Sequence, residues 1–414
     1  MILVERQDIN KSNIPEDWEV KKIDLISEAV FAGGTPSTRN NEFWNGDIPW
    51  MSSGEINNKM IWDTEKRITK KGFESSSTRW VAENSVLIAL AGQGKTRGTV
   101  ALNKIKLCTN QSLAAIVTGA NLNSMFLFHN LDSRYDELRR LSTGDGGRGG
   151  LNLQIIKNIK VKIPPIKEQQ KIATILSTWD KAIELKEKLI EQKKEQKKGL
   201  MQKLLTGEMR LPGFKKEWKK VKLRDIVVGK GKYGLNAPSV EKDSTYPTYL
   251  RITDISNDGH LSTDGLQSVN HPDSNNYYLQ ENDIVFARTG ASTGRSYLYD
   301  KSDGELVYAG FLIRFKIDDT KAVPSYIKFC TQTQSYYYWV KVMSMRSGQP
   351  GINAEEYGQL PILLPSIEEQ LKISKIFNSI DREVLLLAKE INALKQQKKG
   401  LMQQLLTGKT RVKV

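Results

Sequence analysis

Cysteine and histidine are scarce in this chain of 414 residues, which has two cysteines and three histidines. Cys108 and Cys330 lie far apart in sequence and form neither a disulfide framework nor a Cys-x-x-Cys pair, a pattern that suits a reducing cytoplasm. His129, His260 and His271 show no metal-ligand spacing among themselves or with the cysteines. The sequence therefore predicts no metal site, and ordinary surface or packing roles for the histidines.

Long apolar runs are also missing. No stretch approaches the roughly 18 apolar residues of a membrane-spanning helix, and the chain opens with charges where a signal peptide would have an apolar run. We therefore expect no membrane partner. What the chain has instead is a formal charge of +15 and a pI near 9.4, which favour nucleic acid as the partner over simple solvation of basic faces.

Catalytic motifs are absent as well. An adenine-N6 methyltransferase needs an Asp/Asn-Pro-Pro-aromatic motif, and Ile163-Pro-Pro-Ile166 has neither the polar residue nor the aromatic one. We find no nuclease carboxylate-lysine cluster, zinc set or nucleophilic triad. The sequence thus predicts a protein that is not an enzyme and carries no cofactor.

One segment does satisfy a relaxed P-loop pattern, with Ala89 in place of the first glycine and Gly94-Lys95-Thr96 at its end. A working P-loop leads into a helix whose first amides hold phosphates. Here the continuation Arg97–Ala101 is typical of another turn into a strand, and the corresponding Ala287–Arg295 has no Gly-Lys-Thr. A P-loop ATPase is therefore kept only as a less favoured alternative.

The dominant feature is an internal repeat. Lys197–Gly207 returns as Lys398–Gly408, 201 residues later, and in the same register Pro164–Gly207 matches Pro365–Gly408 at 23 of 44 positions. A repeat of this length decides the architecture. It indicates a pseudo-twofold molecule with two similar parts.

The repeat extends into the globular parts, where Trp18–Ile23 corresponds to Trp218–Leu223 and Gly150–Asn152 to Gly351–Asn353. Short runs rich in β-branched and aromatic residues predict mixed α/β domains. The fold class expected is α+β, with two mixed α/β domains joined by two long antiparallel coiled-coil helices. The expected divisions are a first domain at 1–166, a helix at 167–207, a second domain at 208–366, a helix at 367–408 and a tail at 409–414.

The two helices are bounded by prolines before them and by Gly207 and Gly408 after them, as start and stop signals. In the second helix the apolar residues alternate in steps of four and three, broken only by Lys398, a pattern that is typical of a coiled-coil seam. These residues are Ile373, Phe377, Ile380, Val384, Leu387, Ile391, Leu394, Leu401 and Leu405. We expect the partner to be the other helix, running antiparallel over roughly 60 Å. The alternative is that each helix packs only on its own globular domain.

Several Gly-rich loops are candidates for DNA contact, because Gly allows close backbone approach while Arg, Lys and Gln match guanine, phosphate and adenine. The loops at corresponding places differ in their polar residues, as expected of two readers of different sequences. The candidate DNA-binding residues are Arg39, Asn40, Gln93, Lys95, Arg97, Arg148, Arg288, Thr289, Ser292, Thr293, Arg295, Arg346 and Gln349. An ordinary solvated loop explains any single one of them equally well.

The globular halves have diverged, whereas the helix ends have not. The invariant ends are therefore expected to present one surface twice, to two copies of one partner. The candidate partner-binding residues are Lys197, Lys198, Leu200, Met201, Leu204, Lys398, Lys399, Leu401, Met402 and Leu405.

These features together resemble the DNA-specificity subunit of type I restriction-modification systems. The resemblance is carried by Gly33-Gly-Thr-Pro-Ser37, by Trp44-x-Gly-x-Ile-Pro-Trp50, by the helix starts Pro165–Gln169 and Ser366–Gln370, which share Glu-Gln, and by both Gly-Leu-Met-Gln-x-Leu-Leu-Thr-Gly ends. It covers essentially the whole chain. One departure is that the second half has Gly229-Lys-Gly-Lys-Tyr-Gly234 in place of the Gly-Gly-Thr-Pro opening.

The resemblance implies two target-recognition domains, each reading one half of a bipartite double-stranded DNA site. It also implies helices that act as a ruler and bind two modification subunits, which supply S-adenosylmethionine and methyl transfer, with restriction subunits completing the complex. The chain itself would carry no catalytic residue and no cofactor. A sequence-nonspecific nucleic-acid scaffold remains the other alternative.

Overall fold

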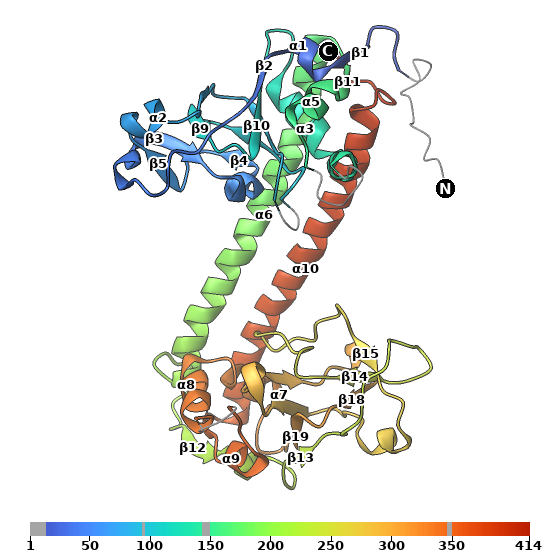
Figure 1. Ribbon diagram of the computed structural model, residues 1–414. Helices are drawn as coiled ribbons and strands as arrows, with labels where there is room; N and C mark the ends of the chain where they lie inside the picture. The colour runs from blue at the N-terminus through green and yellow to red at the C-terminus, as the bar shows by residue number, and fades with distance from the viewer. Residues whose placement is uncertain (1–13, 93–95, 143–149, 346–349) are drawn as a thin grey trace. The chain divides into compact units, whose positions relative to one another are not determined.

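The computed structural model describes residues 14–92, 96–142, 150–345 and 350–414. The chain forms two compact units (Figure 1). Unit 1 comprises Met1–Glu187 and Lys389–Val414, and unit 2 comprises Lys188–Ala388. Each unit thus contains one globular part and a segment from each long helix. The residue ranges expected from the sequence instead kept each long helix in one piece.

The main sheet of unit 1 is built from β2, β10, β7, β8 and β4, in that order. The strands are β2 (Ser27–Ala32), β10 (Leu113–Thr118), β7 (Val86–Ala89), β8 (Val100–Asn103) and β4 (Met60–Ile61). Residues of β7 are buried on both faces because they alternate between two cores. Val86 and Ile88 join the core that contains α3 (Ser124–Asp132), whereas Leu87 and Ala89 join a smaller core.

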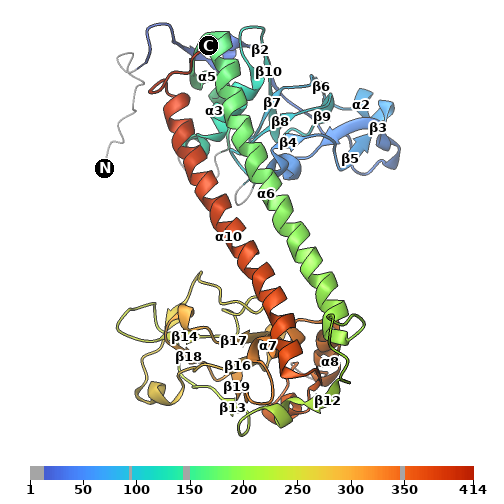
Figure 2. The same ribbon diagram turned by 180° about the vertical axis from the view of Figure 1, so that it is seen from behind.

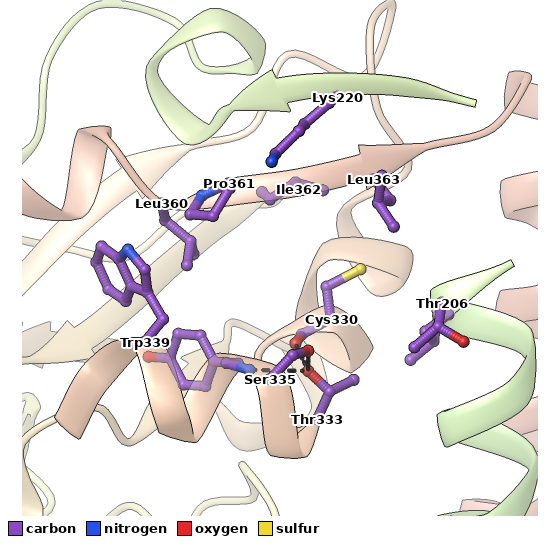
Figure 3. A pocket seen from close by; sticks show the side chains of 12 residues that line it. Thr206, Lys220, Cys330, Thr333, Ser335, Trp339, Leu360, Pro361, Ile362 and Leu363 are labelled. Carbon is purple, nitrogen blue, oxygen red and sulfur yellow. Dashed lines mark hydrogen bonds between the residues drawn. The ribbon is translucent and has the colours of Figure 1, made fainter. Parts of the chain in front are cut away.

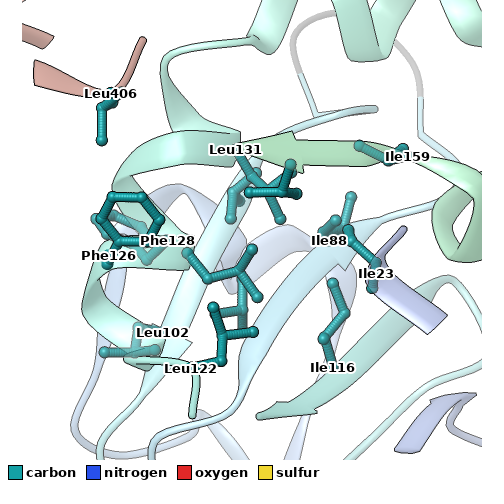
Figure 4. Packing of buried hydrophobic residues seen from close by; sticks show 14 of the residues in the cluster. Ile23, Ile88, Leu102, Ile116, Leu122, Phe126, Phe128, Leu131, Ile159 and Leu406 are labelled. Atoms are coloured by element: carbon teal, nitrogen blue, oxygen red, sulfur yellow. The ribbon is translucent and has the colours of Figure 1, made fainter. Parts of the chain in front are cut away.

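Figure 4 shows the larger core, in which side chains from the main sheet and α3 gather and Leu406 approaches from the segment after α10. A second sheet in unit 1 has the order β5-β3-β9-β6. Its strands are β5 (Lys66–Ile68), β3 (Trp44–Met51), β9 (Leu107–Thr109) and β6 (Trp80–Val81). Figure 2 shows this unit from behind, with α3 close to α6.

Unit 2 repeats this design. Its main sheet runs β13-β19-β16-β17, the same order as β2-β10-β7-β8, and its second sheet runs β15-β14-β18. The strands are β13 (Lys232–Tyr233), β19 (Leu312–Lys316), β16 (Asp283–Ala287), β17 (Ser296–Leu298), β15 (Gln267–Ser268), β14 (Thr248–Leu250) and β18 (Leu306–Tyr308). The parallel pair β3 and β9 of unit 1 corresponds to the parallel pair β14 and β18.

In each unit a two-stranded ladder leads into a long helix. Strand β1 (Glu19–Lys22) pairs with β11 (Lys160–Ile163) before α6 (Ile166–Thr206), and β12 (Lys219–Lys222) pairs with β20 (Pro361–Leu364) before α10 (Ile367–Leu405). The remaining helices are α1 (Ile23–Ile26), α2 (Lys70–Glu74), α4 (Tyr135–Leu141), α5 (Leu153–Asn158), α7 (Pro324–Cys330), α8 (Gln334–Met343) and α9 (Ala354–Gly358).

Ion pairs join the two long helices within unit 1. The ammonium of Lys186 lies 2.6 Å from Glu390, that of Lys395 lies 2.7 Å from Glu187, and Lys398 pairs with Asp180. From the Lys186–Glu390 pair to the Asp180–Lys398 pair, residue numbers fall along α6 and rise along α10, so the two segments run antiparallel. Ile183 and Ile391 are buried beside these pairs.

The segments of unit 2 are joined in the same way. Lys193 lies 2.9 Å from Glu383, and Lys197 lies 2.6 Å from Asp381. The antiparallel pairing is therefore as predicted, and it repeats, since Lys197 and Asp381 correspond to Lys398 and Asp180.

The prediction of one continuous coiled-coil seam, however, is only partly correct. Ile373 and Phe377, at its start, are buried in the hydrophobic core of unit 2, and Leu405, at its end, is buried in that of unit 1. Both expected packing modes thus coexist, because one apolar stripe serves the globular core near the helix ends and the other helix further along. Among the residues that the structure describes, no helix is both long and apolar enough to cross a membrane.

Candidate nucleic-acid interface

The Gly-Gly-Thr-Pro-Ser loop of unit 1 is held by the tryptophans of the neighbouring motif. The indole of Trp44 donates to the carbonyl of Ser37 at 3.1 Å, and that of Trp50 donates to the carbonyl of Gly34 at 3.0 Å. A Cβ on Gly33 would lie only 1.9 Å from the carbonyl oxygen of Thr109. The two motifs therefore form one rigid element that fixes the loop after β2.

Gly234 has the same role in unit 2. A Cβ there would lie 2.2 Å from the carbonyl oxygen of Ala309. The opening that departs from the family pattern in sequence therefore keeps a glycine at the place of Gly33, where the backbone approaches closely, although Leu235 stands at the place of Gly34. The departure affects the neighbouring side chains and leaves the position of the loop unchanged.

Three loops of unit 2 meet at one edge of its main sheet. The amide of Arg288 donates to the carbonyl of Phe311 at 3.0 Å, and the amide of Ile352 donates to the carbonyl of Arg288 at 2.9 Å. The guanidinium of Arg288 lies over the ring of Tyr233, 4.8 Å from its centroid. Loops that are far apart in sequence thus combine into one surface.

Unit 1 has the same backbone arrangement with other side chains. The amide of Leu90 donates to the carbonyl of Ser112 at 2.8 Å, and the amide of Leu151 donates to the carbonyl of Leu90 at 3.0 Å. Leu90 and Ser112 therefore take the places of Arg288 and Phe311. The skeleton of the surface is constant, whereas its side chains differ between the units.

Not every predicted DNA-binding residue of unit 2 lies on this surface. Ser292 is buried, and the prediction for it is wrong, because the segment folds into a 3-10 turn that directs its side chain inward. The hydroxyl of Thr293 donates to the carbonyl of Gly290 at 2.7 Å. Arg295 donates to the carbonyl of Ile255 at 2.9 Å and so anchors its own loop.

Arg288 and Thr289 remain half-exposed at the sheet edge. In unit 1, Arg39 is exposed, and Arg97 is half-buried. The side chain of Asn40 accepts from the amide of Glu42 at 3.1 Å, so it caps a short 3-10 helix. Five other predicted DNA-binding residues lie outside the described residues: Gln93, Lys95, Arg148, Arg346 and Gln349.

The segment after the P-loop-like pattern enters strand β8 at Val100. A P-loop instead places its lysine and threonine at the start of a helix. The described residues from Thr96 onward, which enter a strand and no helix, therefore do not favour a P-loop.

The predicted partner-binding residues divide into three groups. Met201, Leu204, Met402 and Leu405 are buried in the two globular cores, so the prediction of a partner surface is wrong for these four. An apolar side chain at a helix end buries itself on the nearest core of its own unit. Leu200 and Leu401 are half-buried against the same cores.

The four lysines behave differently. Lys197 and Lys398 are half-buried and pair with Asp381 and Asp180. Lys198 and Lys399, the next residues along, are exposed. Only these two of the ten predicted partner-binding residues present a largely exposed side chain.

Sequence reasoning missed the role of the Glu-Gln motif at the start of each long helix. Glu168, at the start of α6, is buried and accepts from the indole of Trp18 at 3.1 Å and from Arg411 at 2.8 Å. Glu369, at the start of α10, accepts in the same way from Trp218 and Arg210. We call each set of three residues a helix-start clasp.

The glutamine of the motif completes the attachment. The carboxamide of Gln169 accepts from the amide of Asn123 at 2.8 Å and donates to the carbonyl of Pro164 at 2.8 Å. Gln370 bonds to Val323 and Pro365 in the same manner. The 201-residue spacing of Arg210 and Arg411 was the signal that could have revealed the clasps, since it continues the register of the repeat.

A cavity of about 300 Å³ lies in unit 2 between β12, β20 and α8 (Figure 3). Its lining is mostly apolar and includes Trp339, Leu360 and Cys330. Burial raises the pKa of the Cys330 thiol to about 12, so this thiol stays protonated and is a poor nucleophile. Within the described ranges, no three His, Cys, Asp or Glu side chains are grouped so that they could hold a metal ion.

Comparison with known proteins agrees with this duplicated design. The type I restriction modification DNA specificity domain, as a family model, matches the chain twice, over residues 15–194 and 215–396. The chain therefore belongs to this family, with two specificity domains in tandem.

Individual relatives cover the whole chain or one half of it. The type I restriction enzyme MjaVIII specificity subunit of Methanocaldococcus jannaschii is 27% identical over 422 residues, covering 97% of this chain and 94% of the relative. The MjaIX specificity subunit of the same organism is 35% identical over 185 residues, covering 44% of this chain and 41% of the relative.

Two solved structures share the fold. The S subunit of a type I restriction-modification system from M. genitalium, 16% identical, aligns with a TM-score of 0.59 over 96% of this chain and 98% of that one. The second structure comes from work on complex assembly and conformational transition of the type I R-M system and is 14% identical. It aligns with a TM-score of 0.58 over 96% of this chain and 99% of that one.

Proposed function

We propose that this chain is the DNA sequence-recognition subunit of a type I restriction-modification complex and has no catalytic role of its own. Each globular part reads one half of a bipartite double-stranded DNA site, while the helices set the spacing between the halves. The observation that carries this proposal is the duplicated loop skeleton, whose backbone bonds repeat at Leu90 and Arg288 while its side chains differ. A constant frame with variable surface residues is what two readers of different sequences need.

The residues proposed to meet DNA are those of the sheet-edge loops that remain at the surface. In unit 2 these are Arg288 and Thr289, and in unit 1 they are Arg39 and Arg97. The loop residues outside the described ranges keep their proposed role: Gln93, Lys95, Arg148, Arg346 and Gln349. The net charge of +15 favours the approach of a duplex to either unit.

Two modification subunits are proposed to dock on the helix ends, since Lys198 and Lys399 are exposed at corresponding positions. Gly199 and Gly400, the residues after them, support this site. Both are exposed in a helix interior, and a Cβ at either would have nothing within 4 Å. A helix glycine costs about 1 kcal/mol relative to alanine, so a partner backbone that approaches closely gives a reason to keep both.

The modification subunits would supply S-adenosylmethionine and methyl transfer to adenine, and restriction subunits would complete the complex. Such a complex acts on DNA in the cytoplasm and needs no membrane. The cytoplasmic location also fits the two free cysteines, Cys108 and Cys330.

The experiment that tests the function is selection from a random duplex pool by the chain in complex with its modification subunit. Enrichment of two defined half-sites at a fixed spacing is expected. A nonspecific scaffold would bind the same pool without enriching any sequence. Salt weakens both kinds of binding, so the selected sequences decide between them.

A further inference from the structure

Unit 2 carries an arginine between two aromatic residues where unit 1 carries three smaller or aliphatic ones. The residues are Tyr233 at the end of β13, Arg288 directly after β16 and Phe311 directly before β19. Tyr233 is 43% exposed and Phe311 is 57% exposed. The corresponding residues of unit 1 are Ala32, Leu90 and Ser112.

Strand register places the three side chains of unit 2 on one face. Ala287 pairs with Leu312, so Arg288 and Phe311 face each other at the next position and point to the same side of the sheet. Tyr233 pairs with Ile313, two residues from Phe311, and therefore shares that side. The aromatic side chains and the guanidinium form one continuous surface patch.

The guanidinium in this patch is held in position before any ligand arrives. It stacks on the Tyr233 ring at 4.8 Å from the centroid, and the hydroxyl of Tyr233 accepts from the amide of Ala354 at 3.2 Å. The ring is thus fixed at the start of α9, and Arg288 is fixed on the ring. An arginine ordered in advance loses less conformational freedom when it binds, which sharpens discrimination.

We propose that Tyr233, Arg288 and Phe311 are the base-reading element of unit 2, in which Arg288 recognises a guanine in the major groove. This inference rests on the proposed function and names residues for it. A guanidinium fork matches the O6 and N7 acceptors of guanine, and a phenyl ring suits the methyl group of a neighbouring thymine. Lys230 and Lys232, both exposed just before Tyr233, are placed to meet phosphates.

The test is selection from the random duplex pool by the complex, followed by a measurement of guanine preference at each position of the half-sites. Arg288→Ala should reduce preference for one guanine in one half-site by about tenfold to a hundredfold and leave the other half-site unchanged. Arg288→Lys should lose the same preference while keeping most of the affinity, because it keeps the charge and loses the fork.

Two tyrosine variants separate the ring from the hydroxyl. Tyr233→Leu should weaken the guanine preference more than Tyr233→Phe does, because only the first removes the stacking surface. Phe311→Ala should relax the adjacent position and leave the guanine preference in place. The matched control is Arg224→Ala, which removes a 55% exposed arginine from the same unit outside the patch and should change neither half-site.

Three outcomes would overturn the proposal. If wild type enriches two half-sites and Arg288→Ala enriches the same two with unchanged base preferences, the patch does not read bases, although the proposed function stands. If Arg288→Ala weakens binding to all sequences equally, Arg288 contacts phosphate instead. If wild type enriches no half-site at all, the proposed function and this inference fall together. Two measurements confirm that each variant is folded. These are its unfolding temperature and, in complex with the modification subunit, methylation at the half-site that the substitution leaves unchanged.

Discussion

The guanidinium of Arg411 forms a two-pronged ion pair with the carboxylate of Glu168, with both nitrogen–oxygen distances at 2.8 Å. The two residues are 243 positions apart in sequence, one just beyond the end of α10 and the other at the start of α6. Arg411 also binds Asp17, and the paired guanidinium holds the pKa of that carboxyl below its usual range. The segment that sequence reasoning treated as a tail is thus part of the unit 1 clasp.

Replacing Arg411 with alanine should destabilise unit 1. The Glu168 side chain is only 3% exposed, so its charge would keep Trp18 as a partner and lose the arginine. Leaving a buried polar group short of a partner costs about 1 to 3 kcal/mol. Urea unfolding should show a loss of this size. Hydrogen exchange should increase at the start of α6.

The matched control for this change is Lys413→Ala, which removes a positive charge from an exposed side chain two residues further on. It should leave the unfolding free energy within about 0.5 kcal/mol of wild type. Arg210→Ala should instead increase hydrogen exchange at the start of α10, where its partner Glu369 lies. Equal exchange at both helix starts in either variant would contradict a clasp that acts within one unit.

The repeat made much of this fold predictable from sequence. A period of 201 residues paired the helices, and their Pro and Gly boundaries agree with α6 and α10 to within a few residues. The periodicity could not say what each apolar residue contacts. Leu401, on the predicted apolar stripe, is only half-buried, whereas Met402, the next residue and outside that stripe, is buried in the core of unit 1. Long-range contacts of this kind are decided by tertiary packing.

The candidate site was predictable only as loops. The Gly-rich pattern marked the loop that contains Arg288, but no local pattern could reveal that Ser292 is buried or that Tyr233 lies under the guanidinium. Tyr233 belongs to the opening that departs from the family pattern, so the resemblance gave it no role. Its contact with Arg288 depends on strand pairing between residues far apart in sequence.

Replacing Gly33 with alanine should disrupt unit 1, and replacing Gly234 should disrupt unit 2. The new Cβ would lie 1.9 Å from the carbonyl oxygen of Thr109 in the first case and 2.2 Å from that of Ala309 in the second. Either overlap forces the backbone to move, with an expected loss of about 1 to 3 kcal/mol. Each variant should lose recognition of one half-site, measured by selection from a duplex pool.

Gly54→Ala is the control for the first of these variants. A Cβ at Gly54 would meet only the hydroxyl of Ser52 at 3.6 Å, an ordinary contact. Stability should therefore stay within about 1 kcal/mol of wild type. If Gly33→Ala has the same unfolding free energy as wild type, the strand ends can move apart without destabilising the protein. That result would contradict the rigid loop described above.

His129 should make the stability of unit 1 depend on pH. Burial, assisted by the positive charge of Lys398, lowers the pKa of this histidine from 6.5 to about 3. Above pH 6.5 the histidine is neutral in both folded and unfolded states. Between pH 6.5 and about 3 only the unfolded state takes up the proton, so stability should fall with decreasing pH by up to about 1.4 kcal/mol per pH unit.

The variant His129→Phe isolates this effect, since Phe329 holds the corresponding place in unit 2, beneath Lys197. The partly buried carboxyl of Asp180, whose pKa is raised chiefly by desolvation, changes stability in the opposite direction and is present in both proteins. The difference in unfolding free energy between wild type and variant should therefore shrink or reverse as the pH falls from 7 to 5. A constant difference over this range would contradict a histidine that stays neutral when folded.

Gly199→Ala should have opposite effects on the isolated chain and on its assembly. Alanine in the interior of α6 should stabilise the chain by about 1 kcal/mol, because nothing lies within 4 Å of the new methyl group. If a modification subunit approaches the helix there, the same methyl group should weaken its binding, and Gly199→Leu should weaken it more. Thermal unfolding and calorimetric titration with the modification subunit measure the two effects separately. Tight binding of Gly199→Leu would mean that the partner docks elsewhere, since a leucine side chain leaves no room for a closely packed backbone.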